Sequence, residues 1–75
     1  MDEADKKLFE KFDEIMKSRP LNADALKFWS KLGKEEYERL IYLFENNKID
    51  IMSDEIRLKL VGMLKNLKGG LYREN

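Results

Sequence analysis

The absence of cysteine and histidine is the feature that most restricts how this chain of only 75 residues can fold. A chain this short buries roughly 60% of the surface that its unfolded form exposes, so its stability is marginal without further support. Disulfide bonds and Cys/His zinc sites are the usual supports of very small domains, and neither can form here. A core of packed helices is the remaining way to hold the chain together.

Apolar residues recur at helical spacing, three and four apart, in four segments of the chain. We therefore predict an all-α fold, a compact bundle of four helices (two longer, two short) in a single domain over residues 1–75. The expected helices cover residues 4–17, 22–32, 34–46 and 53–68. The core residues expected in the first three are Leu8, Phe12, Ile15, Ala25, Leu26, Phe28, Trp29, Leu32, Tyr37, Leu40, Ile41 and Phe44.

Glycines and a short apolar loop are expected to mark the ends of these helices. Gly33 is predicted to end the second helix in a left-handed conformation. The glycines at 69–70 are predicted to stop the fourth helix and to leave 69–75 as a flexible C-terminal tail. Between the third and fourth helices, Ile49, Ile51 and Met52 are expected to plug the end of the bundle.

The fourth predicted helix has two different faces. Its core arc should consist of Ile56, Leu60, Met63, Leu64 and Leu67. A second face combines apolar with basic side chains, and a partner could bind there because Leu58 and Val61 lie about 100° or more from the centre of the core arc. Gly62 falls mid-helix, where glycine costs about 1 kcal/mol relative to alanine and often marks the close approach of another backbone.

The charge balance restricts the classes of partner. The chain has 15 basic and 15 acidic side chains, which argues against coating nucleic acid or membranes through bulk electrostatics. Its longest apolar run, LIYLF at 40–44, is far shorter than the ~18 residues that a membrane span needs. The N-terminal MDEADKK does not resemble a signal peptide, so we expect a cytoplasmic protein with no membrane partner.

Most catalytic chemistries are excluded by residue type. Without histidine or cysteine there is no imidazole base, no thiol nucleophile and no common transition-metal site. The adjacent carboxylates at 13–14, 35–36 and 54–55 diverge by about 100° on a helix, and the glycines lack the spacing of a phosphate-binding loop. We predict no enzyme, no cofactor and no metal; an enzyme that uses carboxylates alone is the weakest alternative.

The remaining function is binding. We predict a small non-catalytic regulatory or adaptor protein that binds another protein, or a second copy of itself as a homodimer. The predicted partner-binding residues are those of the mixed face of the last helix, with two from the third helix that lie off its core stripe: Arg57, Leu58, Val61, Lys65, Lys68, Leu43 and Tyr42.

The alternative is a nucleic-acid-binding accessory protein that uses the basic residues of the C-terminal segment. These are Arg57, Lys59, Lys65, Lys68 and Arg73. Single-stranded nucleic acids are usually bound by aromatic side chains placed among the cations, and this face has none before Tyr72. Nucleic acid is therefore the less favoured partner.

Overall fold

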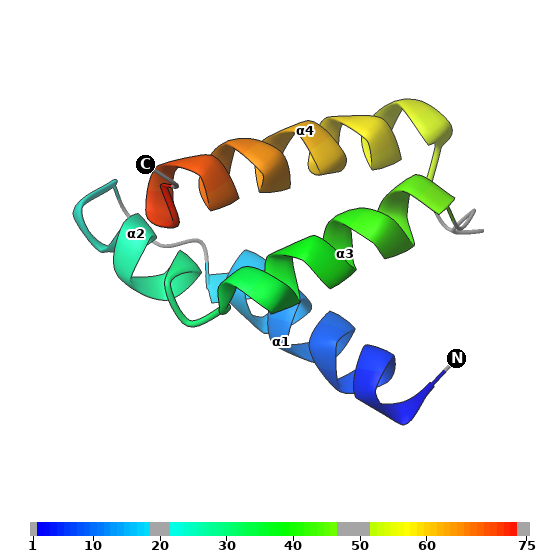
Figure 1. Ribbon diagram of the computed structural model, residues 1–75, viewed down its shortest axis with the longest axis horizontal. Helices are drawn as coiled ribbons and strands as arrows, with labels where there is room; N and C mark the ends of the chain where they lie inside the picture. The colour runs from blue at the N-terminus through cyan, green and yellow to red at the C-terminus, as the bar shows by residue number, and fades with distance from the viewer. Residues whose placement is uncertain (1, 19–21, 47–51, 74–75) are drawn as a thin grey trace. The chain divides into compact units, whose positions relative to one another are not determined.

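The computed structural model describes residues 2–18, 22–46 and 52–73, and all regular structure in this part of the chain is helical. The helices are α1 (Glu3–Ser18), α2 (Asn22–Trp29), α3 (Lys34–Asn46) and α4 (Asp54–Leu71), as Figure 1 shows. The all-α prediction with two longer and two shorter helices is confirmed. Of the predicted plug, Ile49 and Ile51 lie outside the described residues, and Met52 is half-buried. The chain divides into two compact units, Met1–Leu32 and Gly33–Asn75, which we describe separately.

The first unit contains α1 and α2. The stripe of Leu8, Phe12 and Ile15 on α1 is buried, as its spacing predicts. Trp29 at the end of α2 is also buried, and its ring lies 6.0 Å from that of Phe12 between centroids. Leu26 was expected in the same stripe but is 61% exposed. The two turns of α2 thus bury Trp29 and leave Leu26 in solvent.

The junction between α2 and α3 differs from the prediction. Helix α2 ends at Trp29, because the backbone tightens there and the Lys31 N–H donates to the Phe28 carbonyl three residues back at 3.1 Å. Gly33 is not in the left-handed region. Its N–H donates to the Glu36 carboxylate at 3.0 Å, which satisfies a backbone donor at the start of α3. Gly33 is therefore the residue just before α3 and does not close α2 with a left-handed turn.

The second unit is a pair of helices, α3 and α4, that run side by side in opposite directions (Figure 1). The core stripe predicted for α3 is buried. Leu43 is buried as well, at 7% exposure, although its position on a helical wheel placed it outside that stripe. The stripe residues confirmed in the core are Tyr37, Leu40, Ile41 and Phe44.

Helix α4 is rotated relative to the prediction. Val61 is 6% exposed and Leu64 is fully buried, whereas Ile56 is 53% exposed. The cause lies one turn before Val61, where the Arg57 guanidinium reaches the Phe44 carbonyl near the end of α3. A long basic side chain can cover apolar surface with its methylene groups while its charged end finds acceptors. Arg57 therefore lies in the contact with α3 and did not mark the open face.

Helix α4 also continues further than predicted. The glycines at 69–70 are helical and the helix ends at Leu71, so the predicted stop was wrong. The Tyr72 N–H donates to the Lys68 carbonyl at 2.8 Å, and the Tyr72 ring lies 6.1 Å from the Tyr37 ring between centroids. This packing at the end of the helix offsets the low helix propensity of the two glycines.

Candidate functional site

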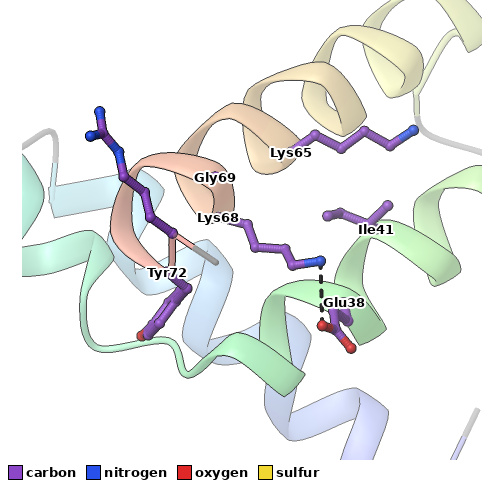
Figure 2. Close-up of a pocket in the computed structure, with 7 residues that line it drawn as sticks. Glu38, Ile41, Lys65, Lys68, Gly69 and Tyr72 are labelled. Atoms are coloured by element: carbon purple, nitrogen blue, oxygen red, sulfur yellow. Dashed lines mark ion pairs between the residues drawn. The ribbon is translucent and has the colours of Figure 1, made fainter. Parts of the chain in front are cut away.

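A hollow of about 600 Å³ opens between α3 and the C-terminal half of α4, and we call it the α3–α4 hollow. It combines basic, aromatic and aliphatic side chains with one carboxylate (Figure 2). Its lining residues are Glu38, Ile41, Lys65, Lys68, Gly69, Tyr72 and Arg73.

Ion pairs between α3 and α4 hold the two lysines of the hollow. Lys68 Nζ lies 3.3 Å from Glu38 Oε1, and Figure 2 shows this side chain extending from α4 to α3. Lys65 Nζ lies 3.5 Å from Glu45 Oε2. All four side chains are partly exposed to solvent, and pairs of this kind contribute at most about 1 kcal/mol. A carboxylate from another molecule could therefore replace either acid at little cost.

The apolar part of the hollow is Ile41 and Tyr72. Tyr72 is held by the ring of Tyr37, which is fully buried. Burial, with a smaller contribution from the nearby Tyr72, raises the pKa of Tyr37 to about 12. Tyr37 thus stays uncharged at neutral pH and acts as an apolar support for Tyr72.

Three of the predicted partner-binding residues are inside the chain. Arg57 donates to the Phe44 carbonyl, and to the Glu45 carbonyl at 3.2 Å. Its side chain is 12% exposed. Val61 and Leu43 are buried. The placement of these three residues on an open face was therefore wrong, because Arg57 reaches the end of α3 and the other two side chains are buried.

The other four predicted residues are accessible. Leu58 is 56% exposed and Tyr42 is 53% exposed, while Lys65 and Lys68 line the α3–α4 hollow. Whether they bind a partner stays a prediction.

Sequence reasoning missed the residues that complete the hollow, namely Glu38, Ile41, Gly69 and Tyr72. A helical wheel of α4 alone shows which basic residues share a face, but not which residues of α3 lie opposite them. One usable signal was the aromatic Tyr72, which stands four residues after Lys68 and so falls on the same side of the helix.

The cations proposed to bind nucleic acid do not form one surface. Arg57 is directed at backbone carbonyls. Lys59 pairs with Glu55 at 3.6 Å along α4, and six residues separate it from Lys65, which places the two about 120° apart on the helix. Of these five cations, Lys65, Lys68 and Arg73 line the hollow.

A second hollow, of about 360 Å³, follows the surface of α1 alone. Lys17 lies 2.9 Å from Asp13 there, and hydrogen bonding to this carboxylate raises the pKa of Lys17. These are ordinary contacts between exposed side chains four residues apart. The lining residues are Glu10, Asp13, Glu14, Lys17 and Ser18.

Comparison with known proteins gave no match to a protein family, to a curated protein or to a solved structure. Within the described residues, no helix has the length and apolarity needed to cross a bilayer. The same part of the chain holds no cluster of three or more acidic side chains arranged to bind a metal ion. The α3–α4 hollow is therefore interpreted from its own geometry.

Proposed function

We propose that the chain is a non-catalytic protein-binding module whose α3–α4 hollow holds an acidic segment of a partner protein. The observation that carries the proposal is the composition of the hollow, in which Lys65, Lys68 and Arg73 stand beside Ile41 and Tyr72. Carboxylates of the partner would replace the Glu38 and Glu45 carboxylates on the two lysines. Apolar groups of the partner would lie on Ile41 and Tyr72.

The side chains that line the hollow favour a protein partner over a nucleic acid, because cations and apolar groups stand together there. A phosphate backbone offers negative charge but no apolar side chains, whereas the lysines of the hollow stand beside the apolar groups of Ile41 and Tyr72. Carboxylates spaced along a polypeptide can instead meet each lysine separately.

Charge reversal at the hollow tests the proposal. The full chain and its Lys65→Glu/Lys68→Glu variant are immobilised, and the proteins retained from a nuclease-treated lysate of the native organism are compared. The control is Lys7→Glu/Lys59→Glu, which changes net charge equally at exposed positions outside the hollow. We expect bound proteins that the control retains and the hollow variant loses. Identical retention by both variants, or binding that disappears with nuclease treatment, would refute the proposal.

A further inference from the structure

The cations of the α3–α4 hollow differ in whether the chain itself supplies them with an acid. Lys65 pairs with Glu45 at 3.5 Å and Lys68 pairs with Glu38 at 3.3 Å. Arg73 also lines the hollow and is exposed to solvent. Among the residues that the structure describes, no hydrogen bond or ion pair holds the Arg73 side chain. The positive charge that is left over among these described groups therefore belongs to Arg73.

A lysine that is already paired gains little from a new carboxylate. To bind an acid of the partner, Lys68 must give up Glu38, so one exposed ion pair is exchanged for another. Arg73 gives up no described partner, and its contact with a carboxylate adds an ion pair to the complex. Arginine suits this contact because its planar fork of N–H donors matches the two oxygens of a carboxylate.

Apolar groups of the hollow stand beside this arginine. Tyr72 precedes Arg73 in the chain, and its ring lies against the fully buried Tyr37. Ile41 of α3 belongs to the same lining. A segment whose carboxylate meets Arg73 can therefore lay a neighbouring apolar side chain on Tyr72 or Ile41.

We infer that Arg73 anchors the partner's acidic segment by binding one carboxylate that stands next to an apolar side chain. This inference rests on the proposed function and specifies which residue of the hollow determines the affinity and what it recognises. The two lysines contribute through exchange of their own acids, which changes the number of ion pairs little.

Three changes of charge test this assignment. Arg73→Gln removes the cation that has no described partner. The double variant Glu38→Gln/Lys68→Gln removes a whole ion pair and leaves the net charge unchanged. Lys7→Gln matches the charge change of Arg73→Gln, because Lys7 is exposed and lies outside the hollow. Circular dichroism confirms that each variant is folded.

The probe is a synthetic peptide that carries leucines between its glutamates and is labelled with an uncharged fluorophore. Its binding to the full chain is measured by fluorescence anisotropy at low salt. Arg73→Gln should raise Kd by about fivefold, the effect of one exposed ion pair at the upper end of its usual range. The double variant and Lys7→Gln should each leave Kd within about twofold.

Glu38→Gln alone should strengthen binding, a result that loss of folding cannot produce. Lys68 then becomes a second cation without its acid, and Kd should fall by about two- to fivefold. An unchanged or higher Kd for this variant would contradict the exchange of acids at Lys68.

Four other results would overturn the inference. Equal effects of Arg73→Gln and Lys7→Gln would show that net charge acts and not Arg73. A larger loss in the double variant than in Arg73→Gln would transfer the anchor to Lys68. If the peptide did not bind the full chain, the inference would be refuted, while the lysate experiment would decide the proposed function separately. An oligothymidylate that bound more tightly than the peptide, and lost binding with Arg73→Gln, would assign Arg73 to phosphate groups.

Discussion

At the scale of single residues, Arg57 explains much of how α3 and α4 are joined. Its guanidinium donates to the Phe44 and Glu45 carbonyls, at the end of α3 where carbonyls lack partners within the helix. It also lies 3.5 Å from the Asp54 carboxylate. Hydrogen bonds from a charged donor contribute about 1.5–3 kcal/mol. Among the described residues its buried Nε has no acceptor, so the favourable contacts come from the other guanidinium nitrogens.

We predict that Arg57→Lys lowers the free energy of unfolding by about 1–3 kcal/mol, because one ammonium group cannot match the fork of donors that the guanidinium presents. Urea unfolding followed by circular dichroism measures the loss. Lys59→Arg is the control, since Lys59 is exposed and pairs only with Glu55 among the interactions described. If the Arg57→Lys variant were as stable as the wild type, the guanidinium contacts would contribute little to the free energy of unfolding.

Tyr37 gives a prediction about pH. Burial raises its pKa from 10.0 to about 12, so the folded chain favours the uncharged phenol more strongly than the unfolded chain does. This contribution to stability is fully present below about pH 10 and is lost as the pH rises through about 12. It amounts to at most about 2.7 kcal/mol, since one pKa unit corresponds to about 1.36 kcal/mol.

Unfolding of the wild type and of Tyr37→Phe at pH values from about 8 to 12 isolates this effect, because the lysines titrate equally in both proteins. Stability of the wild type should fall more steeply above about pH 10 than that of Tyr37→Phe. Parallel curves would mean that the phenol ionises as easily in the folded chain as in the unfolded one.

At the scale of helices, the sequence predicted the existence of all four elements but not the orientation of the last. The stripe of Leu8, Phe12 and Ile15 is regular enough to identify both α1 and its buried face. On α4, apolar residues cover more than one face, and the contact with α3 decides which of them is buried. That contact includes the hydrogen bonds of Arg57 and the ion pair between Lys68 and Glu38, and a single-helix pattern contains neither.

The orientation of α4 can be tested with two aspartate substitutions. Val61→Asp should lower the free energy of unfolding by about 3 kcal/mol or more, since it buries an unpaired charge. Leu58→Asp, three residues away on an exposed position, should change it by about 0.5 kcal/mol or less. Urea unfolding measures both. Equal effects would contradict the burial of Val61 and restore the mixed face that the sequence suggested.

At the scale of the whole molecule, the chain is neutral, and its basic residues do not form one charged surface because acidic side chains lie among them. Fifteen basic side chains balance fifteen acidic ones, and the described ion pairs of α4 account for Arg57, Lys59, Lys65 and Lys68. The homodimer expected from the sequence depended on burying Leu58, Val61 and Leu43. Two of these three are already buried in the chain, which removes most of the reason for a second copy. Binding is therefore expected at a local hollow.

The most direct test of this account is a titration of the ¹⁵N-labelled full chain with a synthetic acidic peptide that carries apolar residues between its carboxylates, followed by backbone amide chemical shifts. The account predicts the largest shifts at Lys65, Lys68, Gly69 and Tyr72, with little change at Lys59 on α4 or along α1. It also predicts that the shifts weaken as salt is raised, because charged groups in solvent are screened. Shifts concentrated on α1, or spread evenly over the basic residues including Lys59, would contradict binding at the α3–α4 hollow.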